Sequence, residues 1–221
     1  MGIREQTREL VLEAAESLFL AKGLLEVSME DIAAKASCTR RNLYRYFDTK
    51  EALTVAVLRK LIEPWNTFQE ETFRLLRGSG LTGRQELSSF LETLTRYLEI
   101  HKDLIRFSAE FDFLFRDHNA FQLDLSSERS MYAEFQVTEK LIVQILEKGE
   151  IDGSLRLPSP PSIIVPTITT VLWALGQRVA LRENLIRIEF GIDGMTIIQN
   201  QIDLIILALT PTKEPEIKEE N

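Results

Sequence analysis

Hydrophobic side chains recur every three or four residues along most of the chain, and this spacing predicts α-helices. The pattern predicts helices at about 6–22, 28–35, from 39 onward, and at about 50–77, 82–101, 104–116, 127–148, 161–182 and 193–209. Residues 104–116 also alternate in part like a strand, but the helical pattern on both sides favours a helix. We therefore predict an all-α protein.

Two short helices are predicted between residues 28 and 51. Ser28 can accept an orphan amide at the first helix start, and Asp31, three residues on, completes the pattern of a capping box. Thr39 is a candidate N-cap of the second helix, which leaves a turn of about three residues from Ala36 to Cys38. Two short helices joined by such a turn form a helix-turn-helix arrangement.

The second of these helices is rich in side chains that bind nucleic acid. Arginine pairs with guanine edges and asparagine with adenine edges, whereas hydroxyl and ammonium groups contact phosphate. A solvated charged face beside two half-buried tyrosines would also explain the cluster, but the caps and the turn length favour DNA binding. We predict base contacts from Arg40, Arg41 and Asn42. Other predicted DNA-binding residues, mostly for phosphate, are Ser28, Thr39, Tyr44, Arg45, Tyr46 and Lys50.

The segment from Leu10 to Leu53 resembles the DNA-binding head of TetR-type (tetracycline-repressor-like) bacterial regulators. The resemblance is carried by Asp31-Ile32-Ala33, by the Leu43-Tyr44-x-Tyr46-Phe47 run and by Lys50-Glu51. It implies a cytoplasmic homodimer in which a long helix joins a three-helix head to a larger helical body for ligand binding and dimerisation. Ser37 stands where the family usually has glycine; if this position requires a positive φ, serine costs about 1 kcal/mol relative to glycine.

Charge is distributed unevenly along the 221 residues, whose net charge is −8. Residues 1–50 balance eight basic against eight acidic residues, whereas residues 51–221 carry 18 basic and 26 acidic residues. Because an acidic body repels DNA, the near-neutral head should face the duplex. We predict a head at 1–50, a ligand-binding and dimerisation body at 51–210, and a charged, disordered tail at 211–221.

The body contains many aromatic residues, most of which must form its core. Several can instead line an apolar cavity between helices, which is the usual form of a small-molecule site. In proteins of the family that the chain resembles, such a cavity binds an inducer. Glu110, Asp112 or His101 could anchor polar groups, and an acidic anchor would suit a cation. The candidate lining residues are Trp65, Phe68, Tyr97, His101, Phe107, Glu110, Phe111, Tyr132, Phe135 and Trp173.

The last two predicted helices are apolar around most of their circumference, so each is expected to be buried on more than one side. One large core would explain this pattern, but the resemblance favours a two-fold interface of four packed helices. The candidate interface residues are Ile164, Ile168, Val171, Leu175, Ile198, Ile202 and Ile205. A homodimer could place two heads on an inverted-repeat operator, with half-sites about 34–36 Å apart or a multiple of that distance.

Other chemistry finds little support in the sequence. His101 and His118 belong to no metal-ligand pattern, and no catalytic or nucleotide-binding motif is present, so we expect no metal, cofactor or enzymatic activity. The lone cysteine, Cys38, suits a reducing cytoplasm, either as a small apolar residue or as a redox switch. The apolar run from Ile163 to Gly176 is shorter than the ~20 residues that span a membrane.

The sequence thus predicts a homodimeric repressor that binds duplex DNA and is released by a small molecule. An activator or a ligand-independent regulator of the same fold is an alternative. A helical ligand-binding or protein-interaction module with a vestigial DNA head is another.

Overall fold

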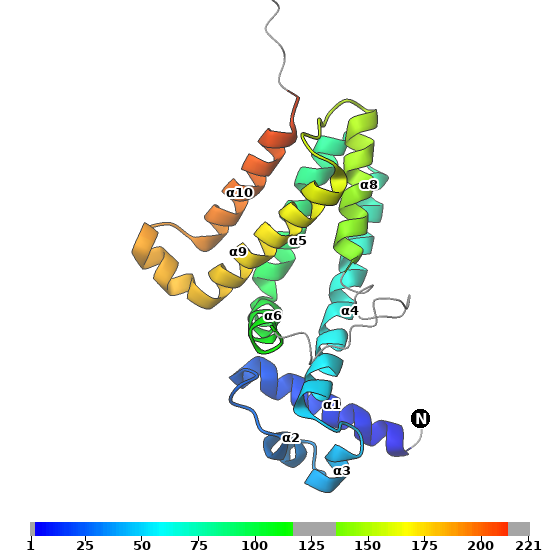
Figure 1. The fold of residues 1–221 in the computed structure, drawn as a ribbon, viewed down its shortest axis with the longest axis vertical. Helices are drawn as coiled ribbons and strands as arrows, with labels where there is room; N and C mark the ends of the chain where they lie inside the picture. The colour runs from blue at the N-terminus through cyan, green and yellow to red at the C-terminus, as the bar shows by residue number, and fades with distance from the viewer. Residues whose placement is uncertain (1–2, 117–135, 212–221) are drawn as a thin grey trace, which may run out of the picture.

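The computed structural model describes residues 3–116 and 136–211, and these residues form α-helices without a β-strand. The all-α prediction is therefore confirmed. The helices are α1 (Ile3–Lys22), α2 (Met29–Lys35), α3 (Arg40–Tyr44), α4 (Lys50–Arg77), α5 (Gly83–Ile100), α6 (Lys102–Leu114), α8 (Val137–Ile151), α9 (Pro161–Phe190) and α10 (Gly194–Leu209). Helices α1 to α3 form a head at one end of the elongated molecule, and α4 rises from it into the body (Figure 1).

Side-chain caps set most of the predicted helix starts. Thr49 Oγ1 accepts from the Ala52 amide at 3.0 Å and begins α4, and Thr82 shares a capping box with Gln85 at the start of α5. Asp193 caps α10 by accepting from the Met195 amide. Because a cap satisfies backbone donors that the helix itself leaves free, its position can be predicted locally.

Two hydrophobic clusters organise the molecule. The first fills the head and includes buried residues of α1, α2 and α3, but it also takes Leu53, Val57 and Ile62 from α4 and Phe107 from α6. The second fills the body between α5, α8, α9 and α10, with Trp65 from α4. The core of the head therefore continues beyond residue 50, and the predicted domain boundary there stays a prediction.

Two helices differ from their predicted form. Pro64 lacks an amide hydrogen and crowds the preceding turn, which predicts a kink or a break in α4, but the helix runs without a break from Lys50 to Arg77. Helix α9 was expected to end near Arg182, where the backbone is indeed non-helical (φ −125°, ψ 18°), yet the helix resumes and continues to Phe190. Ile186 in this continuation is 1% exposed, so burial of its side chain holds the second half of α9 against the body.

Some predictions concern residues beyond those described. Residues 117–119, whose sequence Asp-His-Asn is typical of a turn, lie outside the described ranges. So do the first part of the helix expected from 127 and the tail from 212. Within those ranges, α8 begins at Val137 and continues to Ile151, three residues past the predicted end.

Helix α9 is, among the described helices, the one long and apolar enough to cross a membrane, a property that core helices share. Ile164, Val165 and Ile168 of this helix are buried in the body core. Burial of these side chains within the bundle accounts for part of the apolar composition of α9. The absence of a membrane partner stays a prediction.

Candidate nucleic-acid interface and body cavity

The helix-turn-helix begins with a complete capping box. The Asp31 amide donates to Ser28 Oγ at 3.1 Å, and the Ser28 amide donates to Asp31 Oδ2 at 2.9 Å. The Ser28 hydroxyl also donates to Asp31 Oδ2, and these hydrogen bonds lower the pKa of the Asp31 carboxyl. The start of α2 is thus fixed by groups close in sequence.

The turn between α2 and α3 contains a strained residue. Ser37 has φ +53°, the conformation expected from the family's usual glycine at this position. The Cys38 amide donates to the Ala33 carbonyl at 3.0 Å and closes the turn. Burial raises the pKa of the Cys38 thiol, which disfavours the reactive thiolate and gives no support to a redox role.

Helix α3 is packed on one side and open on the other. Leu43 is fully buried in the head core, and Phe47 just after the helix is 4% exposed. The side chains of Arg41 and Arg45 are exposed, and Asn42 is half-buried. Thr39 Oγ1 accepts from the Asn42 amide at 3.2 Å and caps the helix. The rigid inner side therefore positions the outer polar residues.

Arg40 differs from Arg41 because it already has partners within the head. Its guanidinium forms an ion pair with Glu30 of α2 and lies over the Tyr44 ring, 5.5 Å from the centroid. Hydrogen bonding to Tyr44 and the charge of Glu30 raise the pKa of Arg40. Tyr44 and Tyr46 are half-buried and pack against the head core. These contacts restrict the direction in which Arg40 can extend.

Lys50 is half-buried and has a hydrogen-bond partner within the head. Its ammonium donates to the Leu24 carbonyl in the connection between α1 and α2, and burial lowers the pKa of Lys50. The Leu24 amide in turn donates to Glu110 Oε2 of α6 at 2.5 Å. Both side chains are thus engaged between head and body. Glu110 is not among the residues that line the body cavity, and Lys50 has a partner within the protein. The phosphate contact expected of Lys50 stays a prediction.

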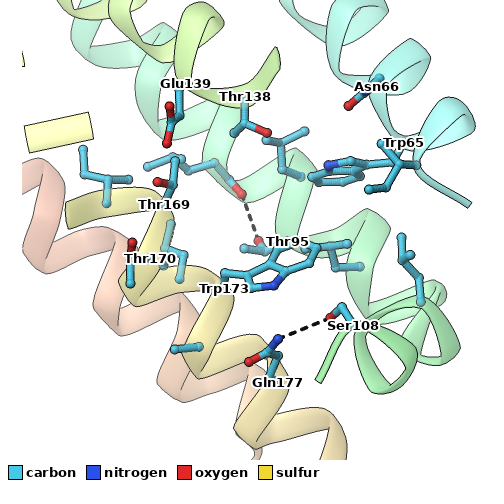
Figure 2. Close-up of a pocket in the computed structure, with 18 of the residues that line it drawn as sticks. Trp65, Asn66, Thr95, Ser108, Thr138, Glu139, Thr169, Thr170, Trp173 and Gln177 are labelled. Atoms are coloured by element: carbon cyan, nitrogen blue, oxygen red, sulfur yellow. Dashed lines mark hydrogen bonds between the residues drawn. The ribbon is translucent and has the colours of Figure 1, made fainter. Parts of the chain in front are cut away.

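Helices α4, α5, α6, α8 and α9 line a partly open cavity of about 450 Å³ (Figure 2). Trp65, Phe111 and Trp173 line it, as does Asp112. Its wall is mainly apolar, and Leu58, Leu94 and Leu104 contribute aliphatic surface. The sequence had suggested no specific role for the polar lining residues Asn66, Thr95, Ser108, Thr138, Glu139, Thr169, Thr170 and Gln177.

The other candidate cavity residues have different positions. Phe68, Tyr97 and His101 form an aromatic cluster outside the lining, with 4.3 Å between the Phe68 and Tyr97 ring centroids. Phe107 is buried in the head core, because its side of α6 faces α1. Tyr132 and Phe135 lie outside the described residues.

The candidate interface residues divide into two groups. Ile164, Ile168, Ile198 and Ile202 are at most 8% exposed and belong to the core of a single protomer, because they face the body bundle. Leu175 and Ile205 are half-buried, and Val171 is exposed. The prediction also omitted several exposed large apolar side chains of α9 and α10, among them Ile163, Leu204 and Leu207.

These features define a class of protein: a helix-turn-helix head carried on a helical body that contains a cavity. Residues 11–57 match the sequence model of the family described as bacterial regulatory proteins, tetR family. This match assigns the head of the chain to the tetR family of bacterial regulatory proteins.

Curated relatives agree with this assignment. A repressor named KstR2 from Rhodococcus jostii is 28% identical over 152 residues, which cover 67% of this chain and 68% of that protein. An activator named FasR from Mycolicibacterium smegmatis is 24% identical over 137 residues, 62% of this chain and 61% of that protein. The match to an uncharacterised regulator of Mycobacterium tuberculosis is 41% identical over 56 residues, and it spans 28% of that protein's length.

Solved structures share the fold. The structure of Thermus thermophilus FadR, a TetR family transcriptional repressor in complex with lauroyl-CoA, is similar with a TM-score of 0.59. The match covers 96% of this chain and all of that chain at 21% identity. The likeness extends the agreement from the head to the fold of the body.

Proposed function

We propose that this chain is a homodimeric, sequence-specific DNA-binding regulator of transcription, most simply a repressor released from its operator by a small molecule. The observation that carries the proposal is the capped α2–turn–α3 unit, whose inner side is buried in the head and whose outer side carries Arg41, Asn42 and Arg45. A helix held in this way can enter the major groove with its polar side outward.

The proposed contacts divide into base-reading and positioning groups. Arg41 and Asn42 are proposed to read bases, because both extend from the outer side of α3. Arg40 can join them by exchanging its Glu30 ion pair for a base edge. Phosphate contacts are assigned to Ser28, Thr39, Tyr44, Arg45 and Tyr46. Lys50 is left out of this group, since its ammonium holds the Leu24 carbonyl.

Ligand control is supported by residues that the cavity shares with the head. Leu58 and Ile62 of α4 and Phe111 of α6 line the cavity and also belong to the head core. A ligand that moves these side chains would also move the packing beneath α1. Release from DNA then requires that the ligand bind the DNA-incompetent arrangement better, as in any population shift.

The relatives support a small-molecule effector but leave the direction of control as a proposal. FadR carries lauroyl-CoA in its structure, and KstR2 is named a repressor. FasR is named an activator, so activation is the alternative. A ligand-independent regulator of the same fold would have no use for the cavity, which favours the ligand-controlled reading.

Dimerisation is proposed through the open sides of α9 and α10. Ile163, Val171, Leu204 and Leu207 leave between 39% and 70% of their surface exposed in the single chain. Such an apolar surface on two neighbouring helices suits the four-helix interface of a two-fold dimer. Two heads then share one inverted-repeat operator in the cytoplasm.

Binding to mixed-sequence duplex DNA, measured by fluorescence anisotropy over a range of salt concentrations, tests the proposal. We expect affinity to fall steeply with salt, because bound phosphates release counterions. The double variant Arg40→Ala/Arg41→Ala should bind more weakly with a shallower slope, whereas Arg84→Ala and Arg96→Ala on α5 should match the wild type. Absence of salt-dependent binding by the wild type would favour an interaction module with a vestigial head.

A further inference from the structure

We propose that the body cavity selects a lipophilic cation with aromatic surface. The inference rests on the proposed ligand-binding function of the same cavity and specifies the chemistry of its ligand. It arises from the charges, the hydrogen-bonding groups and the aromatic rings that line the wall.

The charged residues of the wall are acidic. Glu139 of α8 and Asp112 of α6 line the cavity, whereas no lysine, arginine or histidine does so within the described ranges 3–116 and 136–211. An anionic group bound here would lose hydration, and the carboxylates of the wall would repel it. Both effects disfavour binding of an anion. A cation would be attracted to the same carboxylates.

The two carboxylates lie at different ends of the cavity. Figure 2 shows Glu139 at the top, Ser108 and Gln177 at the bottom, and the Trp173 ring between them. Asp112 belongs to the lower end, because Gln177 Nε2 donates to its Oδ2 at 2.7 Å, and its side chain is exposed. Glu139 is half-buried and forms no ion pair recorded among the described residues. We therefore assign Glu139 as the principal anchor and Asp112 to the rim.

Most hydroxyl groups of the wall donate their hydrogen to an acceptor within the protein. The Thr95 hydroxyl donates to the Leu91 carbonyl at 3.0 Å, and Ser108 donates to the Ile105 carbonyl at 2.8 Å. Thr169 donates to the Val165 carbonyl at 3.1 Å, and Thr138 donates to Gln69 Oε1. With their hydrogens used in this way, these groups offer lone pairs, which suit a positively charged or hydrogen-donating ligand.

Aromatic rings supply the remaining part of the site. Trp65 and Trp173 both line the cavity, and the face of an indole attracts a cation through its quadrupole. Each indole N–H can also donate a hydrogen bond, but it carries no charge with which to neutralise an anion. The surrounding leucines and isoleucines favour an apolar body for the ligand. The combined wall fits a cation whose charge is embedded in aromatic groups.

A pair of probes with the same shape and opposite charge tests this inference: tetraphenylphosphonium and tetraphenylborate. The chain has two tryptophans, Trp65 and Trp173, and both line the cavity, so their fluorescence reports binding directly. We expect saturable binding of the phosphonium, at least about tenfold tighter than that of the borate. Equal or tighter binding of the borate, or no saturable binding of the phosphonium, would overturn the inference.

Substitutions separate the cavity from the general attraction of an acidic protein for cations. Glu139→Gln should weaken phosphonium binding by about tenfold and leave borate binding no weaker. The matched control Glu147→Gln removes an exposed carboxylate from the same helix, outside the lining, and should bind both probes like the wild type. Equal losses in both variants would contradict the assignment of Glu139.

DNA binding by the unliganded protein is measured separately on mixed-sequence duplex. If the protein does not bind DNA but still binds the cation selectively, the proposed regulation is contradicted and the cavity assignment stands. Normal DNA binding with no preference for the cation would overturn the ligand class alone.

Discussion

Ser37 holds a backbone conformation that serine adopts at a cost. Its φ of +53° lies in the left-handed region, where the Cβ of an L-residue crowds the backbone. We expect Ser37→Gly to raise the free energy of unfolding by about 0.5–1 kcal/mol, measured by equilibrium denaturation. The same substitution at Ser17, which is exposed within α1, should instead lower it by about 0.5 kcal/mol. Destabilisation at both sites would contradict the role assigned to the turn.

Substitution of Arg41 is the most direct single-residue test of base recognition. Its side chain leaves the outer side of α3, and it has no ion pair recorded within the described residues, in contrast to Arg40 with Glu30. Arg41→Ala should cost about 1–3 kcal/mol on the preferred sequence and much less on other sequences, measured by competition binding. An equal loss on every duplex would reassign Arg41 to phosphate.

At the scale of elements, the contact between α6 and the α1–α2 connection joins the body to the head. Glu110 accepts the Leu24 amide, and Lys50 donates to the Leu24 carbonyl, so one residue of the connection is held from both sides. Gly23 beside it has φ +88°, and a Cβ there would lie 2.8 Å from Glu110 Oε1. The close approach therefore depends on glycine at this position.

Removing the carboxylate should loosen this contact. We expect Glu110→Ala to speed hydrogen exchange of the Leu24 amide about fivefold, a change of about 1 kcal/mol for a partly exposed hydrogen bond to a charged group. Mass spectrometry of peptides that cover residues 20–27 measures the effect. Glu110→Gln keeps an acceptor oxygen and should stay near the wild-type rate. Unchanged exchange in Glu110→Ala would show that Leu24 is protected by other contacts.

The helix starts could be predicted from residues close in sequence, whereas the cavity depends on how the helices pack. The starts of α2, α3, α4 and α10 were predictable because a capping side chain and the amide it accepts are two or three residues apart. The cavity was not predictable in the same detail, because five helices determine which side of each faces the gap. Glu139 and Thr138 are ordinary polar residues in sequence, and it is the packing of α8 against α4, α5 and α9 that places them in the wall.

At the scale of the whole molecule, α9 and α10 carry apolar side chains both toward the body core and on their exposed sides. Ile168 and Ile202 are buried in one chain, whereas Leu204 and Leu207 are exposed. A helix that is apolar all round indicates burial on several sides but does not identify which side meets its own body. This ambiguity explains why part of the predicted interface proved to be protomer core.

The exposed side of α10 provides a test of dimerisation. A dimer of this 25.4 kDa chain should have a mass of about 51 kDa by light scattering during size-exclusion chromatography. Leu207→Glu should shift the protein to the monomer mass, because it would place carboxylates in the apolar interface. Leu75→Glu changes a similarly exposed leucine on α4 and should leave the dimer intact. A wild-type monomer, or equal effects of both variants, would contradict the proposed interface.

The most direct test of the central claim is selection of binding sites from random duplex DNA by the purified protein. We predict enrichment of an inverted repeat whose half-sites lie about 34–36 Å apart or a multiple of that distance, because two linked heads read one operator. The variant Arg40→Ala/Arg41→Ala, selected in parallel, should fail to enrich it. No enrichment by the wild type at low salt, or the same enrichment by the variant, would contradict the account of a sequence-reading, dimeric regulator.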